Sequence, residues 1–308
     1  MNVGLLHHPL CLEHRLQLRH PERPERLAEV LARLERTGLA ADLRRIDDAA
    51  PVSAEDVARV HPDTFVAGLD AMAPSEGLVH VDSDTFLAPA TLPAARAAAG
   101  AATRAVDELL EGSLDRAFCA VRPPGHHAET TVAMGFCFFN SIAIAARRAL
   151  DVHGLERVAI LDFDVHHGNG TAEIFAGDER VLFASSFQHP WYPDRRTEAV
   201  TENLLFTPLP AGTGSAAFRA AIERDWLPAL DAHRPQLVLV SAGFDAHTED
   251  PLGDLHLDED DYGWVTDLVV DAARRHADGR VLSMLEGGYA IDALGRSAHR
   301  HVEHLLRA

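Results

Sequence analysis

The stretch VAILDFDVHHGNGT, residues 158–171, decides the fold of this chain. It opens with four apolar residues in a row, as strands do when a parallel sheet is covered on both faces. It then changes abruptly to acids, histidines and glycines, which is typical of the carboxyl end of such a strand, where ligands bind. We therefore predict a buried strand over Arg157–Val165 that ends at a functional site.

Short apolar runs of this kind alternate along the chain with longer amphipathic segments. The expected strands are Asn2–Leu6, Ala117–Arg122, Arg157–Val165, Arg180–Phe187, Gln236–Phe244 and Arg280–Leu285, the first being the weakest. The expected helices are Arg23–Arg36, Leu92–Glu111, Phe136–His153, Ser215–Ala232, Asp258–Ala277 and Ile291–Leu306. This alternation predicts an α/β fold, with a mostly parallel central sheet flanked by helices on both faces. Because no repeat or linker interrupts the pattern, residues 1–308 are expected to form a single domain.

Composition excludes several classes of protein. The formal net charge of −19 argues against a nucleic-acid binder, which needs a basic face. No uncharged apolar run approaches the roughly 18–20 residues that span a bilayer. The cysteines Cys11, Cys119 and Cys137 form no CxxC pair, so neither a disulfide framework nor a thiolate metal site is indicated. We expect a cytoplasmic protein without nucleic-acid or membrane partners, and leave open whether it is a homo-oligomer.

Four of the expected strands run into polar clusters that are unusual for ordinary loops. These are PPGHHAE (123–129), DFDVHHGNGT (162–171), SAGFDAHTEDP (241–251) and LEGGY (285–289). Since the carboxyl ends of parallel strands share one edge of a sheet, the clusters predict one composite site.

Two of these clusters contain candidate metal ligands. Asp162, Asp164 and His166 alternate along a strand end, so their side chains point the same way and two of them can share a divalent cation. Their alternative reading is a set of hydrogen-bonded polar residues at a strand tip. Asp245 is a candidate third ligand, or else a turn residue. Asp164, His166 and Asp245 with an open position suit a catalytic Zn²⁺ site, although Fe²⁺ or Co²⁺ also accept these ligands.

The other two clusters contain candidate proton donors and acceptors. His126 and His127 follow a rigid Pro-Pro-Gly turn, where a histidine can act as general base or acid. The alternative is a pair of surface histidines. Tyr289 follows two glycines, and its phenol can donate a hydrogen bond to a developing oxyanion. The alternative is an aromatic residue that covers the sheet edge.

Most of the 19 histidines call for no special role. His299, His301 and His304 lie among arginines on the last expected helix and are predicted to face solvent. His7 and His8 follow the first strand and are candidates for the pocket rim. The glycine motifs lack the GxGxxG and GxxxxGK[ST] patterns, which argues against nucleotide binding.

Seven motifs, in order along nearly the whole chain, resemble the zinc-dependent histone deacetylase and acetylpolyamine amidohydrolase family. They are HPERPERL (20–27), RPPGHHA (122–128), GFCFFN (135–140), DFDVHHGNGT (162–171), SAGFDAH (241–247), DPLG (250–253) and EGGY (286–289). The resemblance implies an arginase-like α/β fold.

The resemblance also implies roles for the candidate site residues. Asp164, His166 and Asp245 match the zinc ligands. His127 matches the general base and acid, His126 its neighbouring histidine, and Tyr289 the tyrosine that polarises the carbonyl group. Asp162 matches the acid bonded to His126. Asn169 stands where some members carry an Asp beside the second histidine, and the Asn form resembles the class II branch.

Further matches concern the substrate channel. Gly135 and Phe136 match one wall of the acyl-lysine channel and Tyr192 the other, while Gly288 leaves room for substrate beside the backbone. Leu252 is apolar where polyamine-selective relatives can carry an acidic gatekeeper. Asp82 or Asp84 could restore a polyamine preference or anchor a peptide backbone. Arg26 matches an arginine near the acetate exit.

The resemblance also implies structural potassium. One K⁺ site would use Asp162, Asp164 and His166, completed by Ser185 and Ser186. A second would use main-chain oxygens near Phe175, Asp178 and Val181. The family often has Ser-Leu-His where this chain has Ser185-Ser186-Phe187.

Together, these features predict a zinc-dependent amidohydrolase that removes acetyl or other acyl groups from lysine side chains of proteins or peptides and releases acetate. The expected partner is therefore an acylated lysine peptide or protein. The main alternative is an acetylpolyamine substrate with the same chemistry. A binuclear-manganese ureohydrolase and a non-catalytic acyl sensor explain fewer of the residues.

Overall fold

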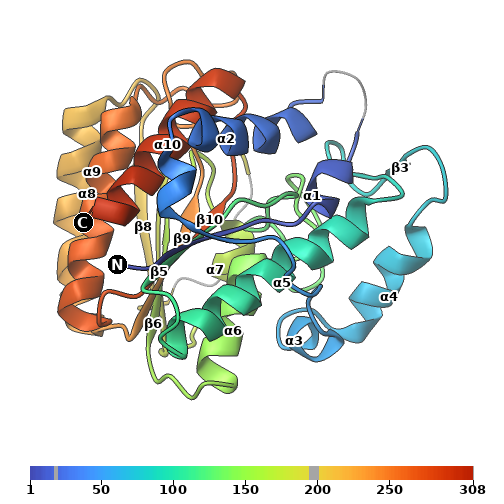
Figure 1. Ribbon diagram of the computed structural model, residues 1–308, viewed down its shortest axis with the longest axis horizontal. Coiled ribbons are helices and arrows are strands. Elements are labelled where there is room, and N and C mark those ends of the chain that lie inside the picture. The colour runs from blue at the N-terminus through green and yellow to red at the C-terminus, as the bar shows by residue number, and fades with distance from the viewer. Residues whose placement is uncertain (17–19, 194–200, 308) are drawn as a thin grey trace.

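Eight parallel strands form the centre of the molecule in a computed structural model, which describes residues 1–16, 20–193 and 201–307 (Figure 1). Across the sheet the strands are β2 (Arg44–Ile46), β1 (Val3–Leu6), β5 (Arg116–Cys119), β10 (Val281–Leu285), β9 (Leu237–Ala242), β6 (Val158–Asp162), β7 (Val181–Gln188) and β8 (Leu204–Leu209). Every pair of neighbours in this sheet is parallel. The predicted α/β sheet is thus confirmed.

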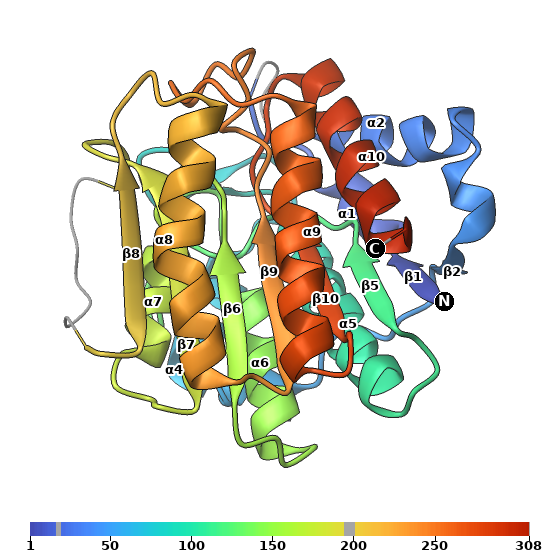
Figure 2. The same ribbon diagram turned by 90° about the vertical axis from the view of Figure 1, so that its left-hand side faces the viewer.

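Helices cover both faces of the sheet (Figure 2). One face carries α8 (Ser215–His233), α9 (Glu259–His276) and α10 (Ile291–Arg307), and α2 (Pro24–Arg36) packs on α10. The other face carries α5 (Thr91–Leu110), α6 (Ser141–Asp151) and α7 (Asn169–Phe175). The smaller elements are α1 (Leu10–Glu13), η1 (Leu39–Asp42), α3 (Ala54–Ala58), α4 (Asp63–Met72) and the antiparallel pair β3 (Val79–His80) and β4 (Phe86–Leu87). These two layers explain why the central strands are mostly apolar: each is covered on both faces, and all five residues of β6 are buried.

The expected strands all form, and the two additional strands of the central sheet, β2 and β8, lie at its edges. In β2 two of three residues are exposed arginines, so no apolar run marks it. In β8 burial is mixed and Pro208 interrupts the sequence LLFTPL, which suits an edge strand. Neither strand carries the continuous apolar pattern that predicts a central position.

The expected helix over Phe136–His153 was wrong in its first turn. The helix begins at Ser141, and the side chain of Asn140 caps it by accepting a hydrogen bond from the Ala143 amide at 3.0 Å. Phe136 has φ +67°, which an α-helix does not allow. These residues therefore form a turn that presents Phe136 to the channel described below.

The prediction that the histidines of the last helix face solvent was wrong for His301. Its side chain is buried, with Nδ1 2.6 Å from Thr266 Oγ1 on α9 and Nε2 2.7 Å from Ser283 Oγ on β10. The buried residues Leu294, Ala298 and Leu305 share its helix face at the usual spacing. This periodicity, rather than the arginines nearby, places His301 against the sheet.

The three cysteines are free and buried. None of the helices in the described part of the chain is long and apolar enough to cross a membrane. The expected cytoplasmic location stays a prediction.

Candidate active site

The four polar clusters lie together because their strands are neighbours. The strands β5, β10, β9 and β6 are adjacent at the centre of the sheet and point the same way. Their carboxyl ends meet at the upper edge in Figure 2. A site is expected at this edge of a parallel sheet.

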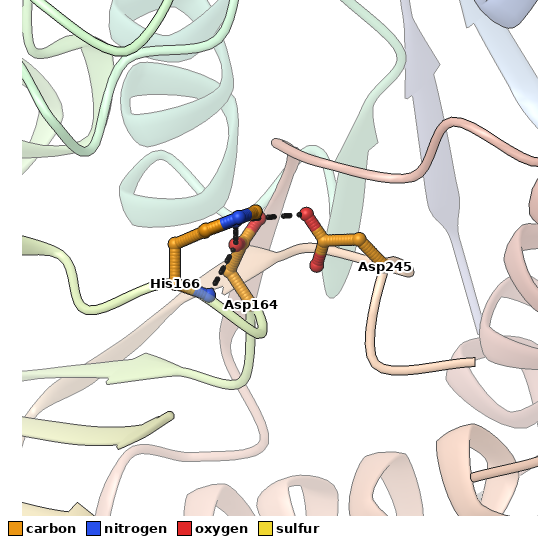
Figure 3. A group of neighbouring side chains, drawn as sticks. All are labelled: Asp164, His166 and Asp245. Atoms are coloured by element: carbon orange, nitrogen blue, oxygen red, sulfur yellow. Dashed lines mark hydrogen bonds and ion pairs between the residues drawn. The ribbon is translucent and has the colours of Figure 1, made fainter. Parts of the chain in front are cut away.

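Asp164, His166 and Asp245 form a compact buried group at this edge (Figure 3). One ligand atom from each lies within 4.8 Å of the others. His166 Nδ1 is 3.0 Å from Asp164 Oδ1 and 3.2 Å from Asp245 Oδ2. Two residues follow β6 and one follows β9, so the register between these strands sets the spacing of the group.

The donor atoms of this group fit a cation. Asp245 Oδ2 is buried and accepts no well-formed hydrogen bond from the described residues, whereas Asp245 Oδ1 accepts one from the Val165 amide at 2.9 Å. A Cβ at Gly287 would lie 1.9 Å from Asp245 Oδ2, and one at Gly243 would lie 2.0 Å from Asp164 Oδ2. Glycine is therefore required where the carboxylates converge. The polar group beside Asp245 Oδ2 is His166 Nδ1 at 3.2 Å, and a bound divalent metal would satisfy this buried oxygen better than that poorly aligned contact does.

The electrostatics of the group also favour a cation. Burial opposes the charge on His166, but its interactions with Asp164 and Asp245 outweigh this effect and raise the pKa of His166 to about 10. Burial and the neighbouring Asp164 raise the pKa of Asp245 above its ordinary value. Two carboxylates in one dry site repel each other, and positive charge between them relieves the repulsion.

The histidine pair beside this group combines two opposite protonation states. His126 Nδ1 lies 3.0 Å from Asp162 Oδ2, and the charges of Asp162 and Asp164 overcome burial and raise the pKa of His126 to about 10. His127 Nδ1 lies 2.8 Å from Asn169 Oδ1, a neutral partner. Burial, followed by the charge of His126, holds the pKa of His127 well below its ordinary value. His127 is thus a neutral imidazole, as a general base must be.

Glu286 fixes the turn that carries the histidine pair. Its Oε2 accepts hydrogen bonds from the backbone amides of Gly125 at 2.7 Å and His126 at 3.2 Å. A Cβ at Gly135 would lie 2.4 Å from His127 Cδ2, so glycine is needed on the other side of the ring. The role of Glu286 was not predicted. The sequence feature that could have indicated this role is the position of the acid between an apolar strand and two glycines.

A cavity of about 310 Å³ leads from the surface to these groups. The residues that line it are Pro21, Asp84, His127, Gly135, Phe136, His166, Trp191, Tyr192, Leu252 and Tyr289. Its walls are mostly apolar and aromatic, while Asp84, His127, His166 and Tyr289 supply polar groups. Such a shape suits an extended, largely apolar chain with one polar end.

The lining contains Asp84, Gly135, Phe136, Tyr192 and Leu252, as the sequence predicted. Trp191 and Pro21 were not predicted. Trp191 donates a hydrogen bond from Nε1 to the Leu252 carbonyl at 2.9 Å and so joins two segments of the rim.

Several further residues that the sequence placed at the pocket lie elsewhere. Among the described residues, Gly288, Asp82, His7 and His8 do not line the cavity. The Gly288 carbonyl faces Arg26, whose Nε donates to it at 2.5 Å. His7 Nε2 lies 3.0 Å from Arg45 Nη2, beside the outer strand β2.

Three buried charged side chains form a network beside the Tyr289 loop, which is the segment 286–290 between β10 and α10. Arg26 donates to the carbonyls of Gly288 and Glu286, each at 2.5 Å, and its guanidinium lies 4.6 Å from the centre of the Tyr289 ring. Glu22 accepts from Arg122 at 2.5 and 2.6 Å and from Arg26 at 3.2 Å. All three charged side chains are fully buried, so each depends on its partners. Arg26 was predicted near the site, and Glu22 was not.

Asp250 holds the same loop from the opposite side. Its Oδ2 accepts from the amides of Tyr289 at 2.6 Å and Ala290 at 3.0 Å, and its Oδ1 accepts from the Leu252 amide at 3.0 Å. One carboxylate therefore links the tyrosine to the channel rim. The sequence contained Asp250 only as part of a motif, without a role.

The two predicted potassium shells differ in their surroundings. For the first, the register of β6 and β7 pairs Asp162 with Ser185, and both are buried. For the second, the carbonyl oxygens of Phe175, Asp178 and Val181 converge on the side-chain amide of Asn203, which was not predicted.

Comparison with known proteins agrees with this geometry. Residues 20–305 match the family described as "Histone deacetylase domain". A histone deacetylase-like amidohydrolase from Pseudomonas aeruginosa is 41% identical over 88% of this chain and 73% of its own length. A probable deacetylase from Archaeoglobus fulgidus is 37% identical over 95% of this chain and 82% of its own length. The crystal structure of an HDA15 HD domain matches with a TM-score of 0.93 and 31% identity, covering 99% of this chain and 89% of that one. Human polyamine deacetylase HDAC10 is 36% identical over 99% of this chain and 48% of its own length.

Proposed function

Because the chain belongs to the histone deacetylase domain family, we propose that it is a zinc-dependent enzyme that removes acetyl or other acyl groups from lysine side chains of peptides and proteins. It is a hydrolase of the deacetylase and amidohydrolase type, as its relatives are. The observation that carries the proposal is the cavity. Apolar walls lead to His127, Tyr289 and the Asp164–His166–Asp245 group at its base.

Asp164, His166 and Asp245 would hold the zinc ion. Two carboxylates and one imidazole with an open side are a suitable set for a catalytic site, and they also accept Fe²⁺ or Co²⁺. When bound, such a metal polarises the amide carbonyl and lowers the pKa of water at the site from about 15.7 toward about 7.

His127 moves the proton. As a neutral imidazole it accepts a proton from the attacking water, which adds to the amide carbon. It then donates that proton to the departing nitrogen as the C–N bond breaks. The products are a carboxylic acid and an amine, and the acid passes its remaining proton to the amine or to solvent, which leaves a carboxylate. Its Asn169 partner orients the ring and leaves it uncharged. His126, charged and bonded to Asp162, contributes a fixed positive charge beside the reacting atoms.

Tyr289 stabilises the tetrahedral oxyanion. Burial raises the pKa of its phenol well above the ordinary value, so the hydroxyl keeps its proton. A preorganised donor of this kind acts where negative charge develops in the transition state.

The channel favours acyl-lysine over acetylpolyamine. The methylene stem of lysine is neutral and apolar, and Phe136, Tyr192 and Leu252 present apolar surface along the cavity. Asp84 at the lining could bind a peptide backbone amide. The same acid and the relative named as a polyamine deacetylase are the observations that favour the acetylpolyamine substrate.

A binuclear ureohydrolase and a non-catalytic acyl sensor are less well supported. Among the described residues, one group of His, Cys, Asp and Glu side chains could hold a metal, whereas a binuclear ureohydrolase needs ligands for two. An acyl sensor would not need a proton-transfer histidine beside the metal group.

We further propose that residues 1–308 act as one cytoplasmic domain.

The first potassium site would bind K⁺ through Asp162, Asp164, His166, Ser185 and Ser186. The pairing of Asp162 with Ser185 across β6 and β7 supports this ligand set.

A substrate panel tests the proposed function. The zinc-loaded protein is assayed against acetyl-lysine peptides, longer acyl-lysine peptides and acetylated polyamines. We expect kcat/KM for an acyl-lysine peptide to exceed that for acetylpolyamines by about tenfold or more. Treatment with a chelator should abolish the activity, and added Zn²⁺ should restore it.

The control is Asp254→Asn, which changes an exposed acid whose side chain is 62% accessible and leaves the described site intact. A higher kcat/KM for acetylpolyamines would replace the lysine assignment by the polyamine one. No hydrolysis of any acyl amide by metal-loaded protein would contradict the enzyme assignment altogether.

A further inference from the structure

Three backbone carbonyl groups converge at the corner between α7 and β7. The oxygens of Phe175, Asp178 and Val181 lie 2.8, 3.2 and 2.9 Å from Asn203 Nδ2, whose two hydrogens are donated to the three oxygens with one hydrogen shared between two of them. Rings of carbonyl oxygens are typical ligands for K⁺. These are also the carbonyls of the second predicted potassium shell. The amide nitrogen therefore stands where that ion would have to bind.

The orientation of the Asn203 amide follows from its other contacts. Its Oδ1 accepts from the Gly177 amide at 3.0 Å and from Thr201 Oγ1 at 2.7 Å. If nitrogen and oxygen were exchanged, the oxygen would face three carbonyl oxygens and the NH₂ group would face an N–H donor. Only the present orientation gives every group a complementary partner.

The charged side chains around this corner are already paired with one another. Arg147 Nη1 lies 2.6 Å from Asp178 Oδ2, and Arg180 Nη2 lies 2.8 Å from the same oxygen. The Arg147 guanidinium also lies 4.7 Å from the centre of the Phe175 ring. Arg180 Nη1 also lies 3.1 Å from Asp151 Oδ1, so the two guanidinium groups are balanced by two carboxylates and no free carboxylate among these four groups is left to attract a further positive ion.

We propose that Asn203 replaces the second potassium ion in this chain: its neutral amide satisfies the three carbonyls, and no cation binds there. The residues do not fit the ion, so this proposal takes the place of the expectation for Phe175, Asp178 and Val181. Asn203 immediately precedes β8, so its side chain ties that edge strand to the α7–β7 corner. The corner would then keep its shape whatever the salt.

Anomalous diffraction with thallium(I), a heavy monovalent substitute for potassium, tests the proposal directly. Crystals of the wild-type protein and of Asn203→Gly are grown with thallium in place of potassium. We expect no anomalous peak among the three carbonyls in the wild type and a peak there in the variant, where the shell has been opened. A wild-type peak bonded to these oxygens, with the Asn203 side chain displaced, would overturn the proposal. The lack of a peak in both proteins would overturn the replacement as well, because the carbonyls would then not form a cation shell.

Thermal unfolding gives a second readout that does not depend on activity. The melting temperature Tm is measured in potassium chloride and in tetramethylammonium chloride at equal ionic strength. Potassium should raise the Tm of Asn203→Gly by about 2 °C or more beyond its effect on the wild type.

Asn203→Asp provides a variant of the same shape in case the glycine variant does not fold. Its carboxylate faces three carbonyl oxygens and needs a cation between them, so its Tm should also depend more strongly on potassium. The matched control Glu202→Gln changes the exposed neighbouring side chain and should respond as the wild type does. An equal potassium effect in all the proteins would contradict the proposal, whereas a failed deacylation assay would leave it unaffected.

Discussion

Substitution of Tyr289 is expected to slow the chemical step without affecting metal binding. Its phenol lines the cavity, but the Asp164–His166–Asp245 group does not include it. We expect Tyr289→Phe to lower kcat by about 10²–10³, the usual effect of losing one oxyanion donor. Zinc content, measured by atomic absorption, should stay at the wild-type level. Near-normal turnover in the variant would remove the tyrosine from the mechanism.

At the residue scale, spacing is what made the site predictable. Asp164 and His166 follow one apolar strand at alternate positions, and Asp245 follows another, so parallel-sheet geometry alone brings them together. Glu22 shows the opposite case. Its partner Arg122 lies 100 residues away, and no local pattern connects the two. A buried acid in a loop has a role that only its tertiary contacts reveal.

The Tyr289 loop is the element whose position the surrounding acids control. Asp250 accepts three backbone hydrogen bonds and thereby joins Tyr289 to Leu252 at the rim. Asp250→Ala leaves these amides without their acceptor, at a cost of about 1–3 kcal/mol for each one that stays buried and unpaired. We expect kcat to fall more than KM rises, because the loop that carries the oxyanion donor loses its support.

Steady-state kinetics and zinc content distinguish this positioning role from general damage. Asp250→Asn keeps one carbonyl acceptor and should recover much of the lost kcat. The exposed acid Asp254, changed to Asn, is the matched control. If the alanine variant loses zinc and kcat to the same extent, the acid supports the metal group rather than the tyrosine.

At the element scale, burial on both faces decided which strands the sequence revealed. The central strand β6 is buried throughout and was expected, while the edge strand β8 has mixed burial and a proline and was not. The sequence also failed to predict the turn that precedes α6. Its left-handed Phe136 depends on contacts with the channel rather than on helix propensity, and the Thr85 hydroxyl accepts a hydrogen bond from its amide at 3.0 Å.

On the scale of the whole molecule, the net charge of −19 is consistent with the substrate class proposed above. Peptides that carry lysine and polyamines are both cationic, and a negative surface attracts them at long range. The charge alone predicted neither the fold nor the site, because it does not depend on where the acids lie. Predicting the site required strands that are parallel and end at one edge of the sheet, and the alternation of apolar runs with helical segments indicated this.

Buried neutral histidines link the stability of the whole fold to pH. His61 Nδ1 lies 3.1 Å from the Thr130 carbonyl oxygen, and its Nε2 accepts from the Asn140 amide at 2.9 Å. Burial lowers the pKa of His61 from 6.5 to about 4. Between these values the unfolded chain binds more protons than the folded one, so stability falls as the pH drops from 6.5 toward 4. The full loss from this group is about 3 kcal/mol, since each pKa unit corresponds to about 1.4 kcal/mol.

His61→Gln should therefore reduce the loss in the free energy of unfolding that occurs as the pH is lowered. The glutamine side chain does not titrate, so the decline in the free energy of unfolding between pH 6.5 and pH 4 should shrink by up to about 3 kcal/mol, even where the variant is less stable at pH 7. Urea unfolding at several pH values measures this slope. Val152→Ala, at an exposed side chain that does not titrate, is the control and should keep the wild-type slope. If both variants follow the wild type, the Nε2 of His61 does not stay unprotonated in the folded protein, and the hydrogen bond that it accepts ahead of α6 would have to open in acid.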